Sequence, residues 1–114
     1  MLTKEQILSA NDLDVEKMSI PEWGGDVYIR PLSSRDRDRW ESQVATTTGK
    51  ITYDNLRAKL VARSICDEQG NLLFSDSDVE ALGNKSAAAM QRIFNRLLEI
   101  NTITDEDIDE LAKN

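Results

Sequence analysis

Carboxylates gather in one short part of the chain, and they are its best candidates for chemistry. The stretch CDEQGNLLFSDSDVEAL, residues 66–82, holds five of them, namely Asp67, Glu68, Asp76, Asp78 and Glu80. Acidic side chains at this spacing can ligate a divalent cation or share a proton as general acid and base. They can equally form a turn followed by the capped start of a helix.

The spacing of this stretch does not fit a calcium loop of the EF-hand type. Such a loop needs oxygen ligands at positions 1, 3 and 5, glycine at position 6 and glutamate at position 12. Counted from Asp67, the glycine arrives too early, at Gly70, and position 12 is Asp78. Counted from Asp76, positions 6 and 12 are both alanine. We therefore interpret the stretch as a turn over residues 67–70, inward-facing residues 72–74, and a helix capped by Ser75.

Composition excludes several other kinds of chemistry. Histidine is absent from the 114 residues, which removes the usual general base and the commonest zinc ligand. The one cysteine, Cys66, cannot form an intrachain disulfide and is typical of a reducing compartment. The sequence shows no apolar run of membrane-spanning length and no secretory signal. We expect no enzyme activity, no cofactor, no membrane partner, and a place in the cytoplasm of the cell that makes the protein.

Charge is distributed unevenly along the chain, whose formal net charge is −7. Residues 31–66 carry seven basic and four acidic side chains, whereas residues 67–114 carry four basic and eleven acidic ones. The overall acidity argues against binding to nucleic acid or membranes, which needs clustered Lys and Arg. The asymmetry is typical of a solvated surface, and it also permits a basic middle to meet an acidic tail within one subunit or between subunits.

Four segments share the same helix-start signature. In each, a Ser or Thr that can cap a helix is followed three residues later by a polar side chain that can bond back, and apolar residues bracket the pair. The caps are Thr3, Thr52, Ser75 and Thr104. Together with hydrophobic periodicity they predict helices over residues 3–9, 33–45 or 34–45, 52–66, 75–82, 85–100 and 105–112. The apolar stripe from Met90 to Ile100 makes the fifth helix the main core element.

Residues 15–32 predict a β-hairpin between the first two helices. Val27 and Ile29 alternate with polar neighbours, and Gly24 with Gly25 can supply the positive φ of a tight turn. Pro21 is typical of an edge strand. A two-stranded ribbon is marginal alone, so it must lie on helices or be completed by another chain. We thus expect a single domain over 1–114, mainly α with a small β-hairpin (α+β), with five to six helices around one core.

The segment SSRDRDRWESQV, residues 33–44, interleaves arginines with carboxylates. Its arginines are Arg35, Arg37 and Arg39. On a helix, Asp36 faces Arg39 and Arg37 faces Glu41, and each pair contributes about 0.2–0.5 kcal/mol. Nucleic-acid binding needs arginines without such acids, so a solvated helix face held to the core by Trp40 is the default interpretation.

Aromatic residues and arginines are the side chains that most often anchor protein interfaces, although buried tryptophan is also common in cores. The candidate partner-binding residues are Trp23, Tyr28, Arg35, Arg37, Arg39 and Trp40. The final helix offers a second surface, because Ile108 and Leu111 form an apolar side that docks either on its own core or on a partner. Its carboxylates are best explained as charges that stabilise a helix N-terminus.

The order of these parts resembles the tail assembly chaperones of long-tailed, lambda-like bacteriophages. The resemblance covers residues 20–114 and is carried by PEWGGDVYIRPL, DEQGNLLFSDSDVEAL, QRIFNRLLEIN and the closing DELAKN. It implies a helical, self-associating assembly factor that binds and solubilises the tape measure protein before the tail tube polymerises, and that is absent from the mature virion. It also implies a longer, frameshifted product that recruits the tail tube protein, with host cytoplasm as the site of action.

Two other functions remain as alternatives. An acidic regulatory protein that mimics nucleic acid and blocks a DNA-binding partner would need its carboxylates in rows on one surface, whereas here they mostly stand at helix starts. A carboxylate-based hydrolase ranks behind it and would be revived by turnover that depends on a divalent metal.

Overall fold

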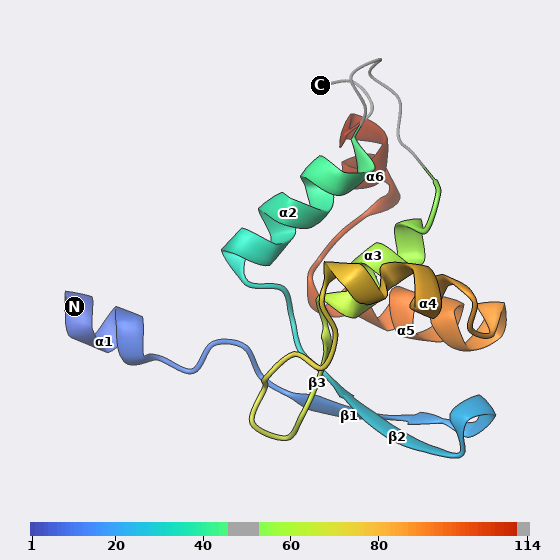
Figure 1. Cartoon of the computed structure of the whole chain (residues 1–114). Coiled ribbons are helices and arrows are strands. Elements are labelled where there is room, and N and C mark those ends of the chain that lie inside the picture. The colour runs from blue at the N-terminus through green and yellow to red at the C-terminus, as the bar shows by residue number, and fades with distance from the viewer. Residues whose placement is uncertain (46–52, 112–114) are drawn as a thin grey trace.

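The computed structural model describes residues 1–45 and 53–111. The six α-helices of this part are α1 (Lys4–Ser9), α2 (Ser34–Val44), α3 (Leu56–Ala62), α4 (Val79–Gly83), α5 (Ala87–Ile100) and α6 (Asp105–Leu111). Its strands are β1 (Glu16–Ile20), β2 (Gly25–Ile29) and β3 (Ile65–Cys66), and its 3-10 turns are η1 (Pro21–Trp23) and η2 (Asp76–Asp78). The predicted α+β class is confirmed (Figure 1).

The predicted hairpin is present, with Glu16 opposite Ile29 and Ile20 opposite Gly25. Pro21, however, does not lie in an edge strand. It opens η1, where the missing amide of proline leaves no bond unmade. Gly24 then ends this turn at φ 71°, a left-handed conformation that glycine adopts without strain.

A third strand, β3, replaces the end of the helix predicted over residues 52–66. The helix runs only from Leu56 to Ala62, and Ile65 then pairs with Ile29. Both residues of β3 are buried, so their apolar pattern does not distinguish a strand from a helix. The segment forms a strand because the second edge of β2 offers backbone hydrogen-bond partners. The cap predicted at Thr52 lies outside the described residues.

The core lies where α3 meets α5, with α2, α4 and the sheet packed around them (Figure 1). The predicted stripe on α5 is confirmed, since Met90, Ile93, Phe94 and Leu97 are at most 5% exposed. Burial of each such side chain contributes about 1.5–3 kcal/mol. This packing, rather than helix propensity, fixes the position of α5.

Hydrogen bonds confirm most of the predicted caps. The amide of Gln6 donates to Thr3 Oγ1 at 3.2 Å, and the amide of Asp107 donates to Thr104 Oγ1 at 3.1 Å. At Ser75 the first turn is the 3-10 turn η2, and α4 starts only at Val79. None of the helices in the described ranges has the length and apolarity needed to cross a bilayer.

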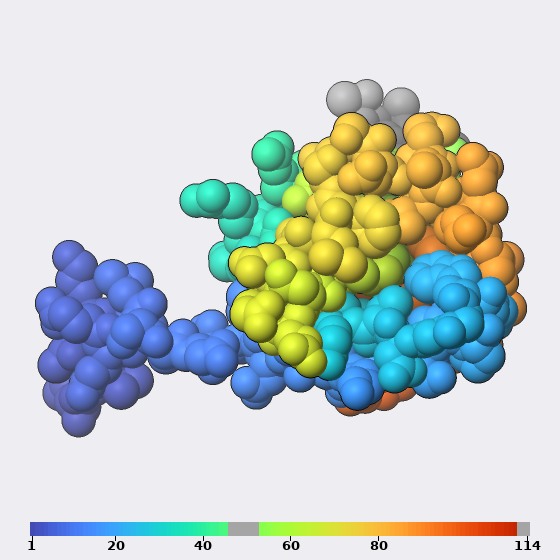
Figure 2. Space-filling view, turned by 60° about the horizontal axis from the view of Figure 1, so that its bottom comes forward, coloured from blue at the N-terminus to red at the C-terminus, as the bar shows by residue number. Residues whose placement is uncertain are grey.

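Residues 1–14, which we call the N-terminal arm, lie apart from the rest of the fold. Residues 1–12 are all exposed, and α1 contributes nothing to the core. Figure 2 shows α1 projecting from the body on a narrow connection. The arm leaves at the start of β1, and η1 lies at the other end of the same strand (Figure 1).

Candidate partner-binding site

The carboxylate stretch forms a turn, as the spacing predicts. The Asp67 carboxylate accepts the amides of Gln69 and Asn71, each at 2.9 Å, and the amide of Gly70 donates to the Asp67 carbonyl at 3.0 Å. The hydrogen bonds to the carboxylate, led by the one from the Asn71 backbone, lower the pKa of Asp67. Leu73 corrects the prediction that residues 72–74 all face inward, because 58% of its surface is exposed.

The carboxylates of the described residues do not gather into a metal site, since they form no cluster of three or more ligand-type side chains. Two of those at helix starts make local contacts instead. Asp78 accepts the Ser75 amide at 2.8 Å, and Asp107 accepts the Thr104 amide at 2.8 Å. Asp78 and Asp107 therefore bond back to the residues that cap their helices, as the sequence indicates.

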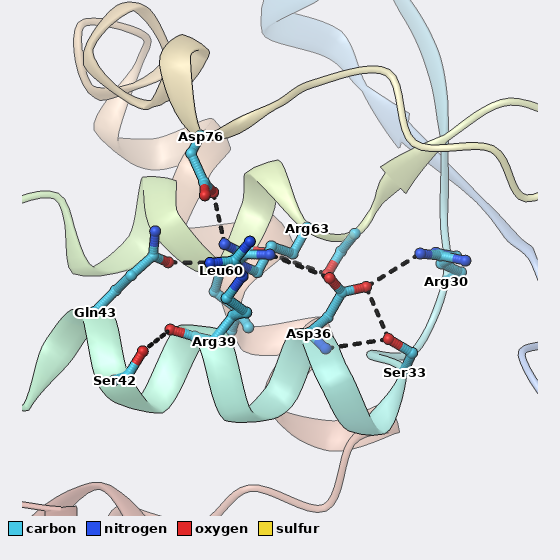
Figure 3. Close-up of polar contacts among 10 residues, drawn as sticks. Arg30, Ser33, Asp36, Arg39, Ser42, Gln43, Leu60, Arg63 and Asp76 are labelled. Atoms are coloured by element: carbon cyan, nitrogen blue, oxygen red, sulfur yellow. Dashed lines mark hydrogen bonds and ion pairs between the residues drawn. The ribbon is translucent and has the colours of Figure 1, made fainter.

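Asp36 is the centre of a largely buried ion network that fastens α2 to the rest of the fold (Figure 3). Its carboxylate accepts from Arg30 at 3.2 Å, from Ser33 at 3.0 Å and from Arg63 at 3.1 Å. Arg63 also binds Asp76 at 2.6 Å, so it links α2 to η2. The predicted pairing of Asp36 with Arg39 is thus replaced by longer-range pairs, because the end of α3 brings a buried guanidinium to the same carboxylate.

The candidate residues on α2, three arginines and Trp40, lie in different environments. Trp40 is fully buried, with its indole Nε1 3.5 Å from the Leu56 carbonyl oxygen, so it packs in the core. Arg37 pairs with Glu41 at 2.7 Å, as predicted. Arg35 and Arg39 are exposed. Of the candidate residues on this helix, only those two are exposed.

Tyr28 lies on β2 and is only partly exposed. Its hydroxyl donates to Glu68 at 2.7 Å, and this bond is the main reason that the pKa of Tyr28 is raised. The Lys17 ammonium lies 5.9 Å from the centre of the ring. Tyr28 therefore joins the hairpin to the 67–70 turn, away from the arginines of α2.

Trp23 forms one wall of an apolar groove, which we call the Trp23 groove. The groove has a volume of about 300 Å³. Its lining residues come from η1, the segment before η2, and the region of α4, and they are Trp23, Phe74, Asp78, Ala81, Leu82 and Lys85. The floor is apolar, and Asp78 and Lys85 place one charge of each sign on the rim. Such a groove suits an apolar side chain on a helix that carries charges of both signs.

Two arginines of α5 hold the hairpin, and hence this wall, in place. Arg92 binds Glu22 through both carboxylate oxygens, at 2.8 and 2.7 Å, and Arg96 binds Glu16 in the same way, at 2.6 Å for both bonds. The bonds from Arg92 are the largest cause of the drop in the pKa of Glu22 to about 2. Paired bonds of this kind fix orientation as well as distance.

The indole nitrogen of Trp23 is a hydrogen-bond donor in the groove wall that lacks an acceptor among the described residues. Nε1 is buried and has no hydrogen-bond partner within the described part of the chain. A shielded donor without an acceptor costs about 1–3 kcal/mol. Trp23 is therefore held by apolar packing and by the neighbouring Glu22 bonds rather than by its own polar atom.

Sequence reasoning found Trp23 but missed the other residues of this groove as a site. In the sequence, Phe74 and Leu82 are simply apolar residues around a helix start. Nothing in the sequence indicates a binding role for Ala81 or Lys85. The groove arises because η1 and α4, which stand far apart in the sequence, line the same space. A periodicity within one element cannot reveal such an arrangement.

The acidic C-terminal helix docks on its own core, the first of the two predicted options. Ile108 and Leu111 of α6 pack against the buried cluster. The pKa of Asp107 is lowered, chiefly by hydrogen bonds from Thr104 and to a lesser degree by the charge of Arg37. The charge of Arg37 on α2 thus acts on the start of α6 within one subunit.

Comparisons with known proteins identify a shared fold and a family. No curated protein matches the chain. A solved structure, that of the bacteriophage HK97 tail assembly chaperone, superposes with a TM-score of 0.63 at 21% identity, covering 85% of this chain and 96% of the other. That likeness shows a shared fold. The family described as phage tail assembly chaperone matches residues 3–114. The chain therefore belongs to the phage tail assembly chaperone family.

Proposed function

We propose that this protein binds the phage tape measure protein and keeps it soluble while the tail tube assembles in the host cytoplasm. In this role it is a binding protein rather than an enzyme, and it is absent from the finished virion. A longer frameshifted product carries the contact to the tail tube protein. Membership of the tail assembly chaperone family supports phage tail proteins as the class of partner.

The Trp23 groove is the observation that best supports a binding role. A long helical client exposes apolar side chains that aggregate unless they are covered reversibly. An apolar floor closed on one side by a large aromatic ring, with one acidic and one basic residue on the rim, can take such a side chain and release it. Trp23 is the anchor in this proposal.

The remaining candidate residues take supporting roles. Arg35 and Arg39 are free to contact acidic positions on the client, and Arg37 and Tyr28 can contribute after exchanging their present partners, Glu41 and Glu68. Trp40 acts indirectly, since it holds α2 on the core from the buried side. The arginines and Trp23 lie on different elements, so the client spans more than one part of the surface.

Co-expression with the tape measure protein encoded in the same phage tests this function. Affinity capture of the chaperone should retain the client in the soluble fraction. Trp23→Ala should leave the chaperone folded and reduce client recovery by about tenfold, the usual scale for an interface anchor. Trp40→Ala is the control, because loss of a buried tryptophan should instead lower the melting temperature.

Two outcomes would count against the proposal. A client that stays insoluble beside a folded chaperone removes the tape measure protein as the partner and favours the acidic mimic of nucleic acid. Full client recovery by a folded Trp23→Ala variant would move the binding surface away from the groove.

A further inference from the structure

The N-terminal arm concentrates the exposed apolar surface of the molecule. Six large hydrophobic residues are exposed in the described chain, and four of them, Met1, Leu2, Ile7 and Leu8, lie in the arm. Leu8 is 75% exposed and Leu2 is 71% exposed. A patch of this kind at the end of a projecting element marks an interaction surface.

The helix α1 also needs a partner for its own stability. It has only six residues, and it carries a complete capping box between Thr3 and Gln6. Isolated helices shorter than about 12–15 residues are marginal in water even with good sequences. The helix α1 has a well-formed cap but no core to pack on. Packing of α1 on another surface would explain this combination.

We infer that α1 of one copy docks in the Trp23 groove of a second copy of this chain. The groove offers an apolar floor that accepts a leucine side chain, with Asp78 and Lys85 on its rim. On α1, Lys4 and Glu5 lie one turn before Leu8, on the same side of the helix. With Leu8 on the floor, one direction of α1 across the groove pairs Lys4 with Asp78 and Glu5 with Lys85, and this match of opposite charges is the one we propose.

Geometry favours a second copy over the groove of the same molecule. The arm leaves at the start of β1, whereas the groove begins at η1, beyond the end of that strand (Figure 1). β1 has five residues, or about 17 Å. The connecting residues 10–15 span at most about 20 Å, and they run outward from the body (Figure 2). To reach its own groove the arm would have to reverse direction and retrace the whole strand.

Docking of α1 in trans has a consequence for client loading. If the groove also takes a client side chain, the arm of a second copy covers it until the client arrives. Self-association and client binding then exclude each other. This consequence rests on the proposed function, whereas the docking of α1 does not.

Complementation between two defective variants tests the docking. Leu8→Asp removes the apolar contact from the arm and leaves the groove intact. Ala81→Arg fills the groove and leaves the arm intact. Sedimentation velocity of the full chain should show concentration-dependent association of the wild type, weakened by about tenfold or more in either variant alone. An equimolar mixture of the two variants should form a one-to-one complex.

Matched controls separate docking from unfolding. Asn11→Asp adds the same charge to the arm beyond the C-cap of α1, and Glu80→Arg adds the same side chain to α4 outside the groove lining; both should associate like the wild type. Glu5→Lys should weaken association, and Lys85→Glu in the same chain should restore it. Circular dichroism should show that every variant keeps the fold of the body.

The inference is overturned if the wild type stays monomeric at all concentrations, or if the mixture of Leu8→Asp and Ala81→Arg variants remains monomeric although the wild type associates. Because no client is present in these measurements, their failure leaves the proposed function standing. Conversely, loss of client recovery in the co-expression assay does not bear on association of the chaperone alone.

Discussion

The helices α1 and α5 begin with the same local device and end in opposite surroundings. Thr3 caps α1 and Ser86 caps α5, each by accepting the amide three residues later. Yet Leu97 of α5 is fully buried, whereas Leu8 of α1 is 75% exposed. Capping decides where a helix starts, and packing decides how much each of its side chains contributes to stability.

The same contrast applies to polar contacts. A carboxylate that meets an arginine inside the fold and one that meets an arginine at the surface look alike in sequence, although their contributions to stability differ severalfold. Matched pairs of substitutions, one in a packed place and one in an exposed place, measure this difference directly.

The largest effect is expected from removal of a core leucine. Leu97→Ala should lower the free energy of unfolding by about 3 kcal/mol, because it deletes buried methyl groups and leaves a cavity. Leu8→Ala, the matched change in α1, should alter it by less than about 0.5 kcal/mol. Urea titration at a concentration where the chain is monomeric measures both. Equal losses would mean that the arm packs on its own body in solution.

Asp36→Ala should give the next largest effect, a loss of about 2 kcal/mol. The change leaves Arg30 without this carboxylate and Arg63 with Asp76 alone. Breaking a fully buried pair costs about 3–5 kcal/mol, and the value here is smaller because Asp76 is half exposed and stays paired.

Glu41→Ala is the control for Asp36→Ala. Its bond to Arg37 lies on the surface of α2, where both side chains are about one-third exposed. Surface pairs contribute about 0.3–0.5 kcal/mol along a helix. A loss for Glu41→Ala as large as that for Asp36→Ala would show that burial does not set the value of these contacts.

Sequence predicted the local parts of this fold better than their assembly. The caps at Thr3 and Thr104, the turn after Asp67 and the buried stripe of α5 all depend on residues within a few positions of one another. The strand β3 was missed because its two buried residues pair with β2, about 36 positions earlier in the chain. The sequence pattern around Cys66 contains no sign of that partner.

In the candidate site, too, sequence predicted single residues but not their assembly. Trp23 was identified from residue type alone, since tryptophan is among the side chains that most often anchor protein interfaces. Trp40 was selected on the same grounds, and the structure places it at 0% exposure because Leu56 and the rest of the core close over it. The Trp23 groove itself is lined by residues of both η1 and α4, so no single segment could have predicted it.

Acid should loosen the hairpin in a defined pH window. The pKa of Glu22 is lowered from 4.5 to about 2, so its contribution to stability is complete above pH 4.5 and is lost as pH falls toward 2. Glu22→Gln should reduce this acid sensitivity, because the side chain no longer takes up a proton. Trp23 fluorescence followed during acid titration reports on the adjacent wall of the groove.

Glu80→Gln is the matched control for the acid experiment, since Glu80 is exposed on α4 and forms no ion pair within the described residues. It should leave the acid transition where the wild type has it. Because Glu22 is at the surface, its effect on stability should be smaller than that of Asp36. If both glutamine variants shift the transition equally, the Arg92 bond is not the cause.

The smallest effect on global stability is expected at the cap of the arm. Thr104→Ala should lower the free energy of unfolding by about 1 kcal/mol, because α6 packs on the core and its start is coupled to the fold. Thr3→Ala removes the same kind of bond from α1 but should leave global unfolding unchanged, since the arm has no buried contact with the body.

The effect of Thr3→Ala should appear in the arm itself and in self-association. Amide exchange in α1 should quicken, and self-association should weaken by about fivefold, the equivalent of about 1 kcal/mol. A Thr3→Ala variant that loses α1 protection yet associates like the wild type would show that the arm is not bound as a helix.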